Sequence, residues 1–231
     1  CDTALIARRL EQEKAAPALF PLGQEMTTQT FATWADSVVF AHAVSLVFQP
    51  ESVAVRFGKL PPDAVKAFLA DRAALFSGGT ASRLPAELAK HEWPAIMARL
   101  EQQLRAGAGE FLFGQPSIAD FALAHCLWFL KATPVTAPLV DAYPVVTAWL
   151  ARVLEFGHGT ATPMTAEQAL EISRNATPAV LPDESIDYGV DPVAGELLFA
   201  GREALILRRT DERAGTVHVH FPRWGFRLQA Q

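Results

Sequence analysis

The sequence GQPSIADF, residues 114–121, has the residue pattern of a helix N-terminus. The hydroxyl of Ser117 can accept a hydrogen bond from the backbone N–H of Asp120, and the Asp120 carboxylate can accept one from the N–H of Ser117. This reciprocal pair is a capping box with Asp in place of Glu or Gln. It stabilises a helix start by on the order of 0.5 to 2 kcal/mol. Because capping boxes are common, the pattern alone predicts a helix N-terminus and a structural role for both side chains.

The segment that contains and follows the box, residues 116–131, is apolar on every side. Its large apolar side chains surround the expected helix instead of forming one stripe. They are Ile118, Phe121, Leu123, Leu127, Trp128, Phe129 and Leu130. A helix that is apolar all round is typical of the centre of a bundle. We therefore predict that this helix is buried among others.

Apolar residues at spacings of three and four predict further helices. The predicted helices cover residues 2–14, 28–48, 63–76, 85–105, 144–157 and 165–173. The prolines and the glycine between residues 49 and 62 predict an irregular segment. Short β-prone runs between residues 197 and 221, with a turn from Asp211 to Gly215, predict a small antiparallel sheet.

The composition excludes several classes of protein. Half of the 231 residues are hydrophobic and 19% are charged, which indicates a folded, globular chain. The net charge of -5 argues against nucleic acid as a partner. No uninterrupted apolar run approaches the roughly 18 to 20 residues of a membrane helix, so we expect no membrane partner. The cysteines, Cys1 and Cys126, are too few for a disulfide framework and indicate a reducing compartment.

Taken together, these elements resemble the glutathione S-transferase superfamily. The Gly-x-Pro-Ser-x-Ala-Asp-Phe element at 114–121 is similar to the start of the central helix in that family's all-helical second domain. The residues YP at 143–144 and WL at 149–150 are similar to the family's next core helix. The residues CDTALI at 1–6 are similar to the end of its thioredoxin-like first domain, where an acidic residue and Ser or Thr open the last helix.

The resemblance implies a mainly α fold, a glutathione-transferase C-terminal-like helical bundle with a small antiparallel β extension. The expected parts are the last helix of a thioredoxin-like domain at 1–15, a linker at 16–27, the all-helical domain at 28–177 and the β extension at 178–231. The chain opens at Cys1 rather than Met. We therefore expect most of the thioredoxin-like domain, and the unknown catalytic residue with it, to lie upstream of Cys1.

The resemblance also implies a role for the pair Asp2 and Thr3. In the family, the hydroxyl and the backbone N–H at this position hold the carboxylate of the γ-glutamyl end of glutathione, and the acid holds its amino group. A helix N-terminus with a hydroxyl and unpaired N–H groups is also a general anion site. The alternative interpretation is an ordinary N-cap.

By the same resemblance, the first helix of the second domain lines a pocket for an apolar electrophile. The candidate pocket residues are Phe31, Trp34 and Val38, with core packing as the alternative. The implied function is conjugation of the glutathione thiolate to that electrophile when the upstream domain is present. The alternative is a non-catalytic binding or scaffold module that acts through protein–protein contacts, so enzymatic activity stays open. Glutathione as co-substrate, a homodimer and a cytoplasmic location are further expectations from the family.

Other candidate residues favour structural interpretations. Cys126 follows His125 on the apolar helix, where neighbouring side chains point about 100° apart, so core packing is favoured over a nucleophilic pair. His218 and His220 alternate onto one face of a strand and could supply two metal ligands. We expect no metal, because no third ligand stands at a convincing spacing.

Overall fold

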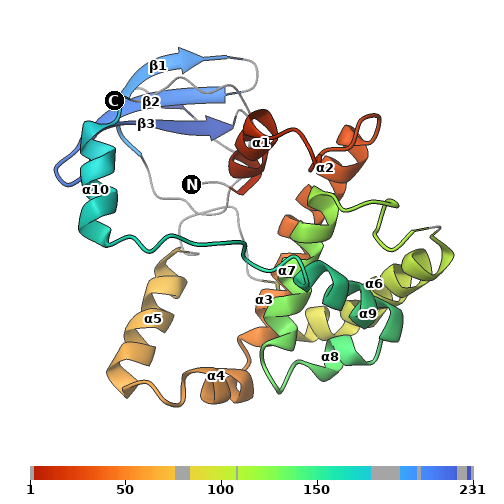
Figure 1. Cartoon of the computed structure of the whole chain (residues 1–231). Helices are drawn as coiled ribbons and strands as arrows, with labels where there is room; N and C mark the ends of the chain where they lie inside the picture. The colour runs from red at the N-terminus through yellow and green to blue at the C-terminus, as the bar shows by residue number, and fades with distance from the viewer. Residues whose placement is uncertain are drawn as a thin grey trace. The chain divides into compact units, whose positions relative to one another are not determined.

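The computed structural model describes residues 3–75, 84–107, 109–177, 193–201, 204–222 and 228–229. The described part is mainly helical with a three-stranded antiparallel sheet, which confirms the expected fold class (Figure 1). The chain divides into two compact units, one formed by residues 1–13 with 158–231 and the other by residues 14–157. This division groups residues 158–177 with the sheet, whereas the sequence analysis placed them in the helical domain. The predicted domain boundaries stay a prediction.

The unit of residues 14–157 is a helical bundle. Its helices are α2 (Glu25–Trp34), the π-helical turn η1 (Ala35–Val39), α3 (Phe40–Val47), α4 (Pro50–Phe57), α5 (Pro62–Leu75), α6 (Ala86–Ala106), α7 (Ile118–Lys131), α8 (Pro138–Asp141) and α9 (Pro144–Leu154). Helix α7 packs against α2, η1, α3, α8 and α9, while α6 packs against α3 and α9. The apolar helix predicted at residues 116–131 is therefore central, and Leu123, Leu127 and Leu130 on it are fully buried.

Helices α2, η1 and α3 form one continuous helix, which the sequence predicted at residues 28–48. By length and composition alone, this helix, Glu25–Val47, is long and apolar enough to cross a membrane, with a mean hydropathy of 1.3. The sequence analysis did not count this helix as a candidate membrane span, because polar residues such as Asp36 interrupt its apolar run. Since 39% of the apolar window is buried within the structure, and since core helices pass the same test, this is weak evidence for a membrane segment.

The prediction of an irregular segment between residues 49 and 62 is wrong in part, because Pro50–Phe57 forms helix α4. Pro50 occupies the first turn of the helix, where its missing N–H costs no hydrogen bond. Helix α5 was expected to bury one apolar stripe. Instead its Leu69 is 40% exposed, and its Phe68 is half-buried against the tilted ring of Phe57, with ring centroids 5.1 Å apart. Most of α5 therefore faces solvent.

The other unit holds α1 (Thr3–Glu13), α10 (Ala166–Asn175) and the strands β1 (Glu196–Ala200), β2 (Ala204–Asp211) and β3 (Gly215–Pro222). The strands pair antiparallel in the order β1-β2-β3, as Figure 1 shows. The predicted turn between β2 and β3 is formed by Asp211, whose Oδ1 accepts hydrogen bonds from the N–H groups of Arg213 and Ala214. Helix α10 packs against β3, where the Ser173 hydroxyl donates to the Ala214 carbonyl over 3.0 Å.

Candidate functional site

Thr3 is the first residue of α1, and its side chain is exposed. Its predicted partner, Asp2, lies outside the described residues. Helix α1 is amphipathic, with Ala7 buried and Ile6 and Leu10 about half exposed. Thr3 is therefore a solvent-exposed hydroxyl at the first residue of a helix.

The three candidate pocket residues lie on α2 and η1 in the other unit. Phe31 contacts Trp34, with ring centroids 5.1 Å apart, and meets Phe113 edge-on at 5.5 Å. Phe31 and Trp34 are partly buried against the bundle core. Val38 differs from them, because it is 40% exposed. The structure thus brings Phe31 and Trp34 together as packed rings and leaves Val38 as an apolar side chain facing solvent.

Trp34 precedes, and Val38 lies within, a feature that the sequence did not reveal. Residues Ala35–Val39 form a π-helical turn between α2 and α3. Within it, the Ser37 hydroxyl donates to the carbonyl of Thr33 over 2.6 Å. Such turns are rare and frequently occur at functional sites. Spacings of three and four cannot distinguish a five-residue π turn from α-helix, so no pattern in the sequence predicts it.

His42 is a second functional candidate, which the sequence analysis did not single out as a site residue. Its ring is buried and lies between two acceptors from different elements. Nδ1 lies 2.7 Å from the backbone carbonyl of Val38, and Nε2 lies 2.8 Å from Oε2 of Glu92 on α6. The Glu92 side chain is 45% exposed, so this contact reaches from the core to the surface.

The capping box at the start of α7 is part of a larger buried network. Asp120 is fully buried, and its Oδ2 accepts hydrogen bonds from the N–H and the hydroxyl of Ser117. Its Oδ1 accepts from the Leu112 N–H and from the Trp149 indole, each at 2.9 Å. One carboxylate therefore joins α9 and the preceding turn to the start of α7. Phe113, whose ring meets Phe31, directly follows Leu112 in the chain.

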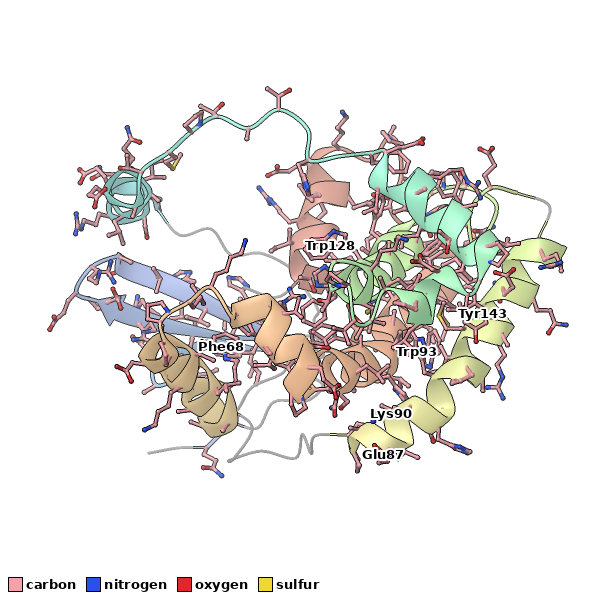
Figure 2. The ribbon with its side chains drawn as sticks, turned by 90° about the horizontal axis from the view of Figure 1, so that it is seen from below. Phe68, Glu87, Lys90, Trp93, Trp128 and Tyr143 are labelled. Carbon is pink, nitrogen blue, oxygen red and sulfur yellow. The ribbon has the colours of Figure 1, made fainter. Side chains whose placement is uncertain are left out.

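Cys126 occupies the core position that the sequence predicted. It is fully buried, and its Sγ lies 3.5 Å from the carbonyls of Ala35 and Ala122. Burial, and secondarily the charge of Asp36, raises the pKa of the Cys126 thiol to about 12. A thiol in that state is not a nucleophile near neutral pH. His125 is exposed and stacks on Trp128, labelled in Figure 2, with ring centroids 6.3 Å apart.

His218 and His220 lie on one face of β3, opposite Arg208 and Ile206 of β2. Burial, and secondarily the neighbouring His218, lowers the pKa of His220. Within the described ranges, no group of three or more His, Cys, Asp or Glu side chains could hold a metal ion. Glu196 of β1 is an acidic residue near this face, but it already forms an ion pair with Arg208.

Comparison with known proteins agrees with this architecture. The family model "Glutathione S-transferase, C-terminal domain" matches residues 86–152, which run from the start of α6 into α9. Among solved structures, a GST-like protein from Pseudomonas syringae is 55% identical, with a TM-score of 0.75. The match covers 98% of this chain and 76% of that protein's chain. No curated protein matches.

A helical bundle centred on a capped apolar helix, matched by that family model, defines the class of the protein as glutathione-transferase-like. The identity to the Pseudomonas syringae protein extends this assignment over nearly the whole chain. The chain belongs to the glutathione S-transferase superfamily.

Proposed function

We propose that the protein conjugates glutathione to an apolar electrophile. The observation that carries this proposal is the 55% identity to a GST-like protein over 98% of the chain. In the proposed reaction, the glutathione thiolate forms a bond to an electrophilic carbon of the second substrate. The leaving group departs with its electron pair, and no oxidant or reductant is required.

Thr3 and Asp2 are the proposed contacts of the γ-glutamyl end of glutathione. The Thr3 hydroxyl and backbone N–H would donate to the glutathione carboxylate, and the Asp2 carboxylate would accept from its amino group. Support for Thr3 comes from its exposed position at the first residue of α1. A helix N-terminus favours a negative group by about 0.3 to 1 kcal/mol before direct hydrogen bonds are counted.

Val38, together with Trp34, is the proposed apolar wall of the electrophile pocket. The support is its 40% exposure and its place on the π turn. Cys126 has no part in the proposed chemistry, because burial raises the pKa of its thiol to about 12. We assign thiolate activation to a residue upstream of Cys1. A homodimer and a cytoplasmic location are parts of the same proposal.

A conjugation assay with 1-chloro-2,4-dinitrobenzene tests the proposal on the natural-length protein. We expect glutathione-dependent product, and we expect Thr3→Ala to raise the KM for glutathione while Thr3→Ser restores it. Thr162→Ala, at an exposed loop threonine, is the matched control and leaves the KM unchanged. Glutathione binding without conjugation of any electrophile tested would favour the alternative, a non-catalytic binding module.

A further inference from the structure

We infer that the side chains of Ser37 and Cys126 hold the π turn η1 and thereby fix the direction of Val38. The inference begins with the backbone of the turn. The N–H of Phe40 donates to the carbonyl of Ala35, five positions earlier, and shares this bond with the Ser37 carbonyl. An α-helix pairs each carbonyl with the N–H four positions later. The Ala35 carbonyl therefore marks the place where the long helix departs from α spacing.

Cys126 contacts that same carbonyl from the core. Its Sγ lies 3.5 Å from the oxygen of Ala35 and 3.5 Å from the oxygen of Ala122. Ala122 lies one turn earlier on α7 itself, whereas Ala35 belongs to η1, against which α7 packs. Both Cys126 and Ala35 are fully buried, so water cannot take the place of the thiol. The thiol thus joins the central helix to the oxygen that accepts the π hydrogen bond.

The thiol of Cys126 keeps its proton at neutral pH. A thiol can donate a hydrogen bond to a carbonyl, whereas a thiolate can only accept one. Burial, and secondarily the charge of Asp36, raises the pKa of the Cys126 thiol to about 12. The group that faces the Ala35 carbonyl is therefore a donor, which is the role that the contact requires.

Ser37 makes a second contact, across the junction between α2 and the turn. Its hydroxyl donates to the carbonyl of Thr33 over 2.6 Å and lies 3.5 Å from the carbonyl of Trp34. A serine that bonds back to the carbonyl four positions earlier bends a helix locally. Ser37 therefore ties the turn to the end of α2, while Cys126 ties it to the core.

The consequence concerns the candidate pocket. Val38 follows Ser37 within the turn and is 40% exposed. On either side of the turn, the buried residues Ala32 and Ala43 hold α2 and α3 in the core. If the turn loses its two contacts and its hydrogen bonds slip by one residue, a side chain on it rotates by about 100° around the helix axis. Ser37 and Cys126 are therefore positioning residues for the electrophile side of the site, and this consequence alone rests on the proposed function.

The first test reads the Ala35 carbonyl directly in the natural-length protein. Carbon-13 in the alanine carbonyls and nitrogen-15 in aspartate select the Ala35–Asp36 bond and few others in NMR, and the signal is assigned by its loss in Asp36→Asn. We expect the carbonyl resonance to move upfield in Cys126→Ala, because the oxygen loses a donor. It should return in Cys126→Ser, whose hydroxyl also donates. Val153→Ala, which removes buried apolar volume on α9, is the control and leaves the signal in place.

Hydrogen exchange at the Phe40 amide tests the π bond itself. Cys126→Ala and Ser37→Ala should each speed this exchange roughly tenfold, while Ser37→Thr, which keeps a hydroxyl, should not. An Ala35 carbonyl that does not respond to Cys126→Ala, or that responds equally to Val153→Ala, would overturn the inference. Because Ser37 is only half-buried, its variants decide the question even if Cys126→Ala does not fold. Unchanged Phe40 exchange in Ser37→Ala would then overturn it.

The conjugation assay tests the consequence for the site. Ser37→Ala should raise the KM for the electrophile roughly tenfold and leave the KM for glutathione unchanged, and Ser37→Thr should restore the wild-type value. Equal changes in both constants would contradict the positioning role. A wild-type protein without conjugation would count against the proposed function only, since the NMR and exchange results stand apart from it.

Discussion

The indole N–H of Trp149 donates to Oδ1 of Asp120 over 2.9 Å, and both side chains are fully buried. This bond joins α9 to the start of α7, the central helix of the bundle. The other carboxylate oxygen completes the capping box with Ser117. A local helix signal and a long-range contact therefore share one side chain, and the stability of the bundle should depend on it strongly.

Asp120→Ala should lower the free energy of unfolding by about 3 to 5 kcal/mol, because it leaves several buried donors without an acceptor. Chemical denaturation followed by tryptophan fluorescence measures the change. Asp141→Asn, at an exposed ion pair with Lys131, should cost no more than about 1 kcal/mol. Equal losses of unfolding free energy in the two variants would show that the Asp120 network contributes no more to stability than an exposed ion pair.

Glu101 should make the bundle sensitive to acid. Burial alone would raise the pKa of Glu101, but hydrogen bonds from the N–H groups of Val146 and Val145 and the contact with Arg105 lower it overall. A carboxyl whose pKa is lower in the folded state adds stability above its unfolded pKa and loses it as the pH falls through the folded pKa.

Glu101→Gln should therefore cost about 1 kcal/mol at neutral pH and flatten the loss of stability on acidification. Denaturant titrations from neutral pH to about pH 3 measure both effects. Glu87→Gln, on the same helix and 85% exposed at its side chain, is the control. A wild-type acid profile that Glu101→Gln leaves unchanged would show that the hydrogen bonds from Val145 and Val146 to Glu101 do not cause the acid sensitivity.

Val38→Ala should reduce kcat/KM for an apolar electrophile by roughly tenfold, as expected for apolar volume removed from a pocket. The unfolding free energy should change by less than about 1 kcal/mol, because Val38 is 40% exposed. Val55→Ala, at a 55% exposed valine on α4, is the matched control and should leave the kinetics unchanged. Kinetic loss in the control alone would place the pocket elsewhere.

Cys126 should resist thiol reagents in the folded protein, because the thiol is fully buried and its pKa is raised to about 12. Iodoacetamide followed by peptide mass spectrometry should find Cys126 unmodified under native conditions and modified in denaturant. Rapid native modification at neutral pH would show that the thiol is accessible, against the packing described above.

Local patterns predicted much of this architecture, because helix caps and apolar spacing act over a few residues. The capping box and the central position of α7 follow from residues 116–131 alone. The partners of Asp120 on α9 and in the preceding turn do not, since the chain must first bring Trp149 and Leu112 to it. For the same reason the His42–Glu92 pair, 50 residues apart in sequence, could not be read from a pattern.

Two errors in the helix predictions have local causes. Prolines were taken as breakers near residue 50, although Pro50 starts helix α4 in a position that requires no N–H. The π turn Ala35–Val39 differs from α-helix by one extra residue in the turn, which apolar spacing does not record. In the candidate site, the sequence predicted Phe31, Trp34 and Val38 together as pocket residues. Only the structure shows that Val38 is exposed while the rings of Phe31 and Trp34 pack against the core.

The most direct test of the proposed function is a calorimetric titration of glutathione into the natural-length protein, with the 231-residue chain titrated in parallel. We predict saturable binding by the natural-length protein with a Kd in the micromolar to millimolar range, weakened in Thr3→Ala and unchanged in Thr162→Ala. No heat of binding from either protein at millimolar glutathione would contradict the assignment of glutathione as substrate.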